Sequence, residues 1–173
     1  VKETKIKVAI LGIGNCASSL VQGIEYYSKN KTEDGLISDK IGGYSVSDIE
    51  IVAAIDINDT KVGRDLSEAI FESPNNSIKF QNISRTGVIV NSGKALDGIG
   101  RFVESKIKIA RESEDTVKLL IDSGAEIMVN LLPVGSDEAV KYYAQCAIEA
   151  KVGFINCIPV FIARDDEWKN KFK

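Results

Sequence analysis

The segment that most constrains the fold of this chain is VAILGIGNCASSL, at residues 8–20. It begins as a continuous apolar run, as expected for a strand that helices cover on both faces of a parallel sheet. Gly12 and Gly14 follow one residue apart, and Ala17 stands at the third small position of a G-x-G-x-x-A pattern. Apolar residues at helical spacing then continue to about residue 27. The pattern predicts a strand, a tight turn and a helix, which is the context in which this motif binds dinucleotides.

Each part of this turn serves to hold a pyrophosphate. The first small residue permits the turn, the second lets the phosphates approach the backbone, and the third lets the helix pack on the strand. The helix N-terminus adds unpaired N–H groups and about half a positive charge. We expect the side chains of Asn15 and Ser18 to add hydrogen bonds to phosphate or ribose. The alternative is a tight turn that holds no ligand.

Cys16 lies in the first turn of the predicted helix, a position that can lower the pKa of a thiol. A catalytic thiol normally needs a base, and the chain contains no histidine. We therefore interpret Cys16 as a small residue that fills space, with a small dehydrogenase that uses Cys16 or Cys157 as its nucleophile as an alternative. The lack of histidine also removes the commonest metal ligand, so no metal site is predicted.

A second apolar strand is expected at residues 51–55, and Asp56 ends it. An acidic residue at this point accepts hydrogen bonds from the adenosine ribose and repels a 2′-phosphate, which favours NAD over NADP. Asp56 lies much further from Gly12 than the usual spacing of about 20 residues. The polar, glycine-bearing residues 28–48 supply the excess as an insertion. The alternative is that Asp56 only ends a strand.

The rest of the chain alternates strand and helix patterns. Further strands are expected at residues 88–90, 127–132 and 153–158, and helices from a Thr60 cap to residue 71, from residue 115 to Gly124, and from a Ser136 cap to residue 150. SPNNS at residues 73–77 predicts a turn, and residues 95–114 have no clear period. The alternation predicts a single α/β domain over residues 1–173, with a doubly wound parallel sheet of the Rossmann type.

The loop that follows the strand expected at residues 127–132 is a second candidate for ligand contact. Residues 131–136, LLPVGS, open the next helix near the crevice in which open α/β sheets bind ligands. Their apolar side chains suit a nicotinamide ring. An ordinary strand-to-helix loop is the alternative.

Composition narrows the classes of function. The net charge of −3, from 22 basic and 25 acidic residues, offers no basic face for a nucleic acid. No apolar run approaches the roughly 18 residues of a membrane span, and the N-terminal residues lack the features of a secretory signal. Cys16, Cys146 and Cys157 are odd in number and far apart, which favours reduced thiols in the cytoplasm.

Six sequence blocks resemble those of myo-inositol-phosphate synthases of the archaeal and actinobacterial type (inositol-3-phosphate synthases), in the same order and at compatible spacing. They are GIGNCASSLVQGIEYY at 12–27, AAID at 53–56, KVGRDLSEAIFESPNN at 61–76, ALDGIG at 95–100, NLLPVGSDEAVKYYAQCAIEA at 130–150 and NCIPVFIA at 156–163. The resemblance runs nearly end to end. Several blocks are far longer than a generic dinucleotide motif, which makes the resemblance specific.

This resemblance implies a reaction. In the family, glucose 6-phosphate is oxidised with bound NAD, enolised, closed by an aldol step and reduced again to give inositol phosphate. It also implies a cytoplasmic homotetramer that serves inositol and phospholipid biosynthesis. The catalytic lysines and much of the tetramer contact of the family lie in a further domain, so the resemblance implies an apparently truncated N-terminal, NAD-binding half with no catalytic residue in this chain and no activity alone.

The resemblance also implies the residues that hold NAD. The full set is Gly12, Gly14, Asn15, Cys16, Ala17 and Ser18 at the pyrophosphate, Asp56 at the ribose, Asn75 and Asn76 near the cofactor, Asp65 and Tyr143 as lesser contacts, and Leu132, Pro133, Val134 and Ser136 at the nicotinamide. The open alternative is a non-catalytic NAD-binding module or partner subunit that completes its fold with another chain.

Overall fold

A computed structural model of the chain describes residues 5–30, 32–100, 105, 107–112 and 115–173. Its centre is a five-stranded sheet of order β3-β2-β1-β4-β5, in which every neighbouring pair of strands is parallel. The strands are β1 (Ile6–Leu11), β2 (Ile49–Asp56), β3 (Val90–Ser92), β4 (Ile127–Asn130) and β5 (Gly153–Asn156). Because β1 pairs with both β2 and β4, the strand order reverses beside the carboxyl end of β1. Open α/β sheets bind ligands in the crevice at such a point.

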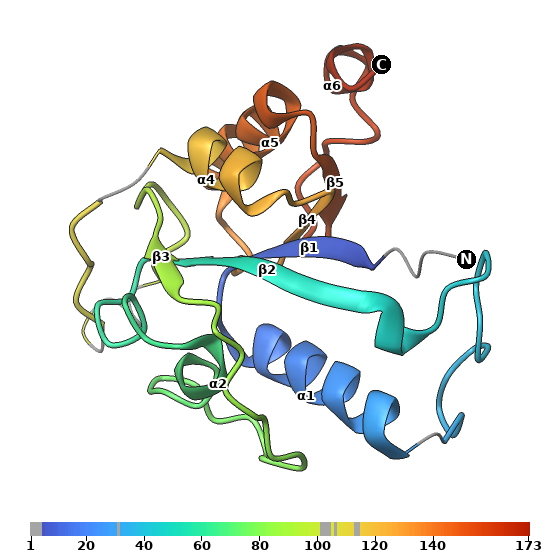
Figure 1. Ribbon diagram of the computed structural model, residues 1–173. Helices are drawn as coiled ribbons and strands as arrows, with labels where there is room; N and C mark the ends of the chain where they lie inside the picture. The colour runs from blue at the N-terminus through green and yellow to red at the C-terminus, as the bar shows by residue number, and fades with distance from the viewer. Residues whose placement is uncertain (1–4, 31, 101–104, 106, 113–114) are drawn as a thin grey trace.

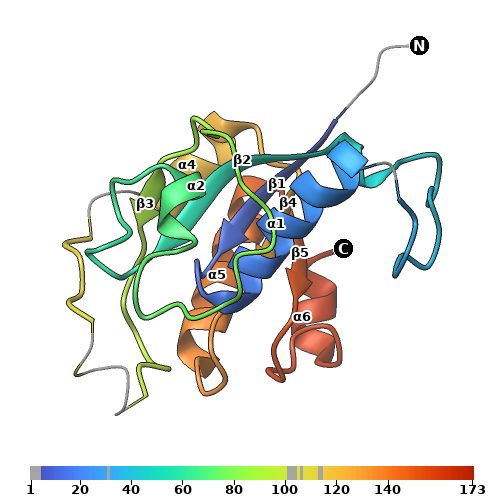
Figure 2. The same ribbon diagram turned by 90° about the horizontal axis from the view of Figure 1, so that it is seen from below.

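Helices cover both faces of the sheet (Figure 1). Helices α1 (Asn15–Asn30) and α2 (Leu66–Ala69) lie on one face, and α4 (Thr116–Ser123) and α5 (Asp137–Ala150) lie on the other. Figure 2, in which the molecule is seen from below, shows α1 in front of the sheet and running along β1. The short helix α6 (Asp166–Lys171) follows β5 near the C-terminus. The predicted doubly wound Rossmann-type sheet is confirmed.

Two apolar cores follow from the alternation of side chains along the central strands. Val8 and Ile10 of β1 belong to the core beneath α1 and α2, whereas Ala9 and Leu11 belong to the core beneath α4 and α5. Side chains of successive strand residues point to opposite faces, so a strand covered on both faces must be apolar throughout. This explains the uninterrupted apolar run that ends at the glycine turn.

The structure corrects several expected element bounds. Thr60 does not cap a helix that reaches residue 71, because α2 is a single turn whose N-cap is Asp65, with the Asp65 side chain accepting from Ser67 N. The third strand is Val90–Ser92 instead of residues 88–90. The fourth and fifth strands each end two residues earlier than expected.

The region expected to be an insertion is only partly irregular. Helix α1 extends through residue 30, and a 3₁₀ turn, η1 (Val46–Asp48), comes directly before β2. Within the region of residues 95–114, residues 101–104, 106 and 113–114 lie outside the described part of the chain. No helix in the described residues is long and apolar enough to cross a membrane.

Candidate functional site: the glycine turn at the carboxyl edge of the sheet

Gly12 is locked into the turn between β1 and α1. Its φ is +86°, a left-handed conformation that glycine adopts at little cost. A Cβ built at Gly12 would lie 3.1 Å from the carbonyl carbon and oxygen of Leu131, so the turn packs directly against the β4–α5 loop. Gly12 N donates to the Ile55 carbonyl at 2.8 Å, which ties the turn to β2 as well. The predicted role of the first glycine, a tight turn, is what the geometry provides.

Gly14 differs from Gly12 in its surroundings. A Cβ built there has no atom within 4 Å beyond its chain neighbours, so the space beside Gly14 is open. Ala17, at the third small position, is fully buried against the core beneath α1. These are the properties expected of the second and third small residues of the motif, one open to a ligand and one packed on the sheet.

The N-terminus of α1 is open, unlike the N-termini of the other α-helices in the described residues. In the described chain, aspartate side chains accept hydrogen bonds from first-turn amides of the other α-helices: Asp65 on α2, Asp115 on α4, Asp97 on α5 and Asp165 on α6. The backbone amides of residues 14–17 have no such acceptor among the described residues, and the first turn of α1 carries no acidic residue. Unpaired amides at a helix N-terminus form an anion-binding site.

Asp56 lies at the carboxyl end of β2, next to this open end. Its Oδ2 accepts from Ile13 N at 2.7 Å, and its Oδ1 accepts from Asn58 N at 2.8 Å. Each carboxylate oxygen has two acceptor positions, so both retain capacity for a ribose hydroxyl. In the β2–β3 register Asp56 pairs with Ser92, whose buried Oγ has no hydrogen-bond partner among the described residues. The alternative interpretation of Asp56 as a plain strand end omits its bond to the glycine turn.

A buried lysine beside the turn was missed by the sequence analysis. Lys61 is 3% exposed, and its Nζ donates to the Ile13 carbonyl at 2.7 Å and to Asn75 Oδ1 at 2.8 Å. Asn75 Nδ2 donates to the same Ile13 carbonyl at 3.0 Å. Burial lowers the pKa of Lys61, while the charges of Asp56 and Glu72 oppose that shift. Lys61 stands out because it is buried, and lysine is almost never buried without partners.

Asn15 and Asn76 connect the start of α1 to the turn at residues 73–77. Asn15 Nδ2 donates to Asn76 Oδ1 at 2.7 Å, and Asn15 Oδ1 accepts from the backbone amides of Asn76 and Ser77. The structure thus brings the predicted site residues Asn15, Asn75 and Asn76 together around the glycine turn. Their side chains contact protein groups here, and the predicted phosphate contact of Asn15 stays a prediction.

Cys16 and Ser18 occupy opposite environments on the first turn of α1. The Cys16 side chain is exposed, so it does not fill a gap in the core as the sequence analysis expected. Ser18 is fully buried, and its Oγ accepts from Gln22 Nε2 at 3.2 Å. Gln22 in turn holds the backbone of residues 78–81. A contact between Ser18 and a ligand remains a prediction that this arrangement does not favour.

The β4–α5 loop borders the turn on its other side. Leu132 is half-buried, whereas Pro133 and Val134 are exposed, with 75% of Val134 open to solvent. Ser136 precedes α5 at the N-cap position, but its Oγ donates to the Pro133 carbonyl and does not cap the helix. Asp97, forty residues earlier in the chain, accepts from Glu138 N and Ala139 N instead. The loop therefore offers apolar surface beside Gly12, and its predicted contact with a nicotinamide ring stays a prediction.

Tyr143 is buried beneath the segment that follows β3. Its Oη accepts from Lys94 N at 2.8 Å, and burial raises its pKa. A Cβ on Gly93 would collide with this hydroxyl, so Gly93 is needed for the close approach. The side chain has a clear structural role, and its predicted contact with the cofactor stays a prediction.

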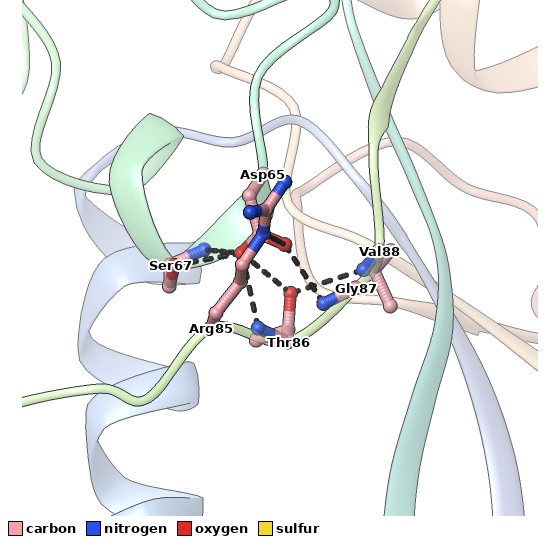
Figure 3. A network of polar contacts seen from close by, with 6 residues as sticks. All are labelled: Asp65, Ser67, Arg85, Thr86, Gly87 and Val88. Carbon is pink, nitrogen blue, oxygen red and sulfur yellow. Dashed lines mark hydrogen bonds and ion pairs between the residues drawn. The ribbon is translucent and has the colours of Figure 1, made fainter.

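Asp65 lies in a hydrogen-bond network that includes no residue of the glycine turn (Figure 3). Its buried carboxylate accepts from the backbone and hydroxyl groups of Ser67 and Thr86 and from Gly87 N, and Arg85 lies 3.8 Å away. Burial would raise the pKa of Asp65, but the hydrogen bonds from Ser67 and Thr86 outweigh it and hold the pKa well below its usual range. Four of these hydrogen bonds go to Oδ1, and Oδ2 accepts from Gly87 N and faces Arg85, so the carboxylate is already engaged by protein groups. The predicted cofactor contact of Asp65 gains no support from this geometry.

Two hollows lie elsewhere on the molecule. A groove of about 510 Å³ lies beside α4 and α5, with an acidic and aromatic lining that includes Glu112, Tyr142 and Glu149. Burial, foremost, raises the pKa of Tyr142 there to about 12. A smaller, more apolar hollow lies between β5 and α6. The described residues contain no cluster of three or more side chains suited to hold a metal ion.

Comparison with known proteins identifies relatives but no family model that matches. Inositol-3-phosphate synthase of Mycolicibacterium smegmatis is 51% identical over 173 residues, covering 98% of this chain and 48% of that protein. The enzyme of the same name from Mycobacterium tuberculosis is 50% identical, covering 98% of this chain and 47% of that protein. The chain thus spans about half the length of the curated relatives it matches.

Solved structures share the fold. The crystal structure of Ari2 matches with a TM-score of 0.80 and 32% identity, over 97% of this chain and 51% of that chain. A myo-inositol-1-phosphate synthase-related protein from Thermotoga maritima matches with a TM-score of 0.72 and 22% identity, over 96% of this chain and 51% of that chain. The latter likeness concerns the fold alone. The chain is therefore related, over nearly its whole length, to the inositol-3-phosphate synthases.

Proposed function

We propose that this chain binds NAD and forms the dinucleotide-binding part of an enzyme that converts glucose 6-phosphate to inositol phosphate. The open N-terminus of α1 carries the proposal. Among the described residues, the backbone amides of residues 14–17 have no acceptor. In every other described α-helix, an aspartate side chain accepts hydrogen bonds from the first-turn amides. A diphosphate would satisfy these donors, and the partial positive charge of the helix end would stabilise it.

The side chains around the turn fit the rest of a dinucleotide. Gly14 leaves space for the phosphates, and Asp56 retains acceptor positions for the adenosine ribose at the end of β2. The apolar residues 132–134 lie beyond Gly12 and suit the nicotinamide ring. When bound, NAD supplies hydride transfer. The residues of this chain orient it and, through the Asp56 carboxylate, discriminate against a 2′-phosphate.

The names of the relatives support the choice of reaction. Because the chain spans about half of their length, the proposal places the groups that act on the sugar phosphate outside these 173 residues. We also propose that several copies of the protein assemble and that the protein lies in the cytoplasm. The three free cysteines are in keeping with the cytoplasm. The chain alone is then expected to bind NAD without turning over glucose 6-phosphate.

The test compares two glycine-to-valine variants on the same helix. Gly14→Val puts a side chain into the open space at the phosphate position, whereas Gly23→Val places the same side chain on α1 away from the turn, where nothing lies within 4 Å. We expect the wild type and Gly23→Val to bind NAD⁺ equally in isothermal titration and to bind NADP⁺ more weakly. Gly14→Val should remain folded by circular dichroism and lose measurable NAD⁺ binding.

Equal NAD⁺ affinity of Gly14→Val and Gly23→Val would overturn the proposed binding site. Absence of saturable NAD⁺ binding by the wild type would overturn the proposed cofactor. An inositol phosphate assay with glucose 6-phosphate and NAD⁺ tests the remainder, and turnover by the chain alone would show that its catalytic groups lie within these 173 residues.

A further inference from the structure

The carbonyl group of Ile13 receives two side-chain donors in the interior of the protein. Lys61 Nζ donates to it at 2.7 Å and Asn75 Nδ2 at 3.0 Å, and Lys61 also donates to Asn75 Oδ1 at 2.8 Å. Ile13 is fully buried and Lys61 is 3% exposed. Burial of an amine is costly unless hydrogen bonds compensate, so this lysine is held where it is by its two acceptors.

The direction of this carbonyl fixes the direction of the next amide. A trans peptide group is planar, so the C=O of Ile13 and the N–H of Gly14 point in opposite directions. Two donors on the buried carbonyl therefore turn the Gly14 N–H away from Lys61 and Asn75. Hydrogen bonds at one end of a peptide group also polarise it, which strengthens the donor at its other end. The Gly14 amide has no acceptor among the described residues.

The preceding peptide group is fixed as well. The N–H of Ile13 donates to Asp56 Oδ2 at 2.7 Å, so both peptide groups that flank Ile13 are held by side chains from β2 and the segment after it. The side of Gly14 where a Cβ would stand is open. The peptide group between Ile13 and Gly14 is thus held by a side chain 62 positions away in the sequence.

We infer that Lys61 and Asn75 act as a clamp on the peptide group between Ile13 and Gly14, which aims the Gly14 N–H at the diphosphate of a bound nucleotide. Lys61 is a positioning residue that touches the loop and not the ligand. The inference rests on the proposed function, because that function supplies the anion. The positive charge of Lys61 also favours binding of the diphosphate. Asp56 and Glu72 favour the protonated amine, against the effect of burial on its pKa.

The test separates the phosphates from the nucleoside. Lys61→Met keeps an unbranched side chain, shorter by one atom, and removes its donors and its charge. Lys141→Met makes the same change at an exposed position of α5. Binding of ADP and of adenosine is measured for both variants by titration calorimetry. We expect Lys61→Met to weaken ADP binding by about tenfold, as for the loss of one well-placed hydrogen bond, and to leave adenosine binding within about twofold. Lys141→Met should match the wild type with both probes.

A second readout needs no ligand. Nuclear magnetic resonance of the free protein reports the amide shift of Gly14 and the carbonyl shift of Ile13, which we expect to change together in Lys61→Met and to stay unchanged in Lys141→Met. If Lys61→Met fails to fold by circular dichroism, Asn75→Ala carries the same test, because it removes the second donor to the Ile13 carbonyl and keeps Lys61.

The outcomes distinguish this inference from the proposed function. ADP and adenosine weakened equally in the clamp variant, or unchanged Gly14 and Ile13 signals, would overturn the clamp while NAD⁺ binding by the wild type still stands. A wild-type chain that binds neither ADP nor NAD⁺ would overturn both, because no anion would then be present for the Gly14 amide to meet.

Discussion

At the scale of single residues, Gly12 and Gly14 have different roles although they lie only two positions apart. Gly12 has a positive φ and touches the backbone of Leu131, so both its conformation and its surroundings exclude a side chain. Gly14 meets neither restriction, because a Cβ there would stand in open space. The fold explains Gly12 completely and leaves Gly14 without a structural reason. A residue that the fold does not require to be glycine, at an open helix end, supports the proposal that a ligand approaches its backbone.

Asp56 provides a prediction at the same scale. Its carboxylate holds Ile13 N and Asn58 N, so Asp56→Ala would disturb the turn as well as the ribose contact, and Asp56→Asn is the sharper variant because it keeps one carbonyl oxygen. We expect Asp56→Asn to weaken NAD⁺ binding by about 1–3 kcal/mol, the usual range for a lost charge-assisted hydrogen bond, and to weaken NADP⁺ binding less. Titration with both nucleotides measures the change in discrimination.

The control for that prediction is Asp59→Asn, three positions along the chain. The Asp59 carboxylate lies 3.5 Å from Lys108 Nζ and has no contact with the glycine turn. Asp59→Asn removes the same charge from the same region as Asp56→Asn, so a general electrostatic effect would appear in both variants. Equal preference for NAD⁺ over NADP⁺ in Asp56→Asn and the wild type would place the ribose contact on another residue.

At the scale of elements, the sequence predicted the ends of a helix where the capping residues adjoin it. It did not predict the cap where the capping residue is distant in the sequence. Helix α4 is capped by the residues that flank it, Asp115 and Gly124, and the helix predicted from residue 115 to a stop at Gly124 agrees with these bounds. Helix α5 has Ser136 at the N-cap position, but the groups that accept its first amides belong to Asp97, which the fold brings from forty residues away. Capping by a distant carboxylate leaves no local pattern, so the sequence alone could not reveal it.

Helix α2 shows the same limit and supports a prediction about pH. Asp65 joins the start of α2 to residues 86–87 through a buried carboxylate (Figure 3). We expect Asp65→Asn to lower the free energy of unfolding at pH 7 by about 2–3 kcal/mol, because the amide group turns a donor toward donors. The hydrogen bonds hold the folded-state pKa of Asp65 below its unfolded value of about 4.

The sign of the pH dependence follows from that shift. A depressed folded-state pKa gives stabilisation that is fully present above the unfolded pKa and is lost as the pH falls toward the folded pKa. The difference in unfolding free energy between wild type and Asp65→Asn should therefore be constant near neutral pH and shrink below about pH 4. Urea denaturation at several pH values measures it, with the exposed Asp39→Asn as control. A difference that does not change with pH would contradict the assignment.

At the scale of the whole molecule, the sequence predicted the architecture and most of the residues that lie around the glycine turn. It did not predict the hydrogen bonds that connect those residues. The apolar run of β1 and the alternation of strands and helices reflect burial on both faces of the sheet, which is a property of each segment. Lys61 was missed because lysine is normally solvated, and its burial depends on acceptors from residues 13 and 75. Contacts between segments decide such positions, and a single sequence does not contain them explicitly.

Those same contacts predict how a ligand would affect the entire fold. The glycine turn bonds to β2 through Gly12, packs on the β4–α5 loop at Leu131, and connects to residues 73–77 through Asn15. A ligand that holds the turn therefore binds a surface that exists only when these segments are assembled, and it must stabilise the folded state by mass action. At a ligand concentration of 100 times the Kd, the free energy of unfolding rises by about 2.7 kcal/mol.

For a chain of this size we expect the melting temperature to rise by about 5–10 °C in saturating NAD⁺. Scanning calorimetry measures the shift, which should be absent for Gly14→Val and retained for Gly23→Val. A rise of equal size in both variants would show that NAD⁺ stabilises the protein from somewhere other than the glycine turn.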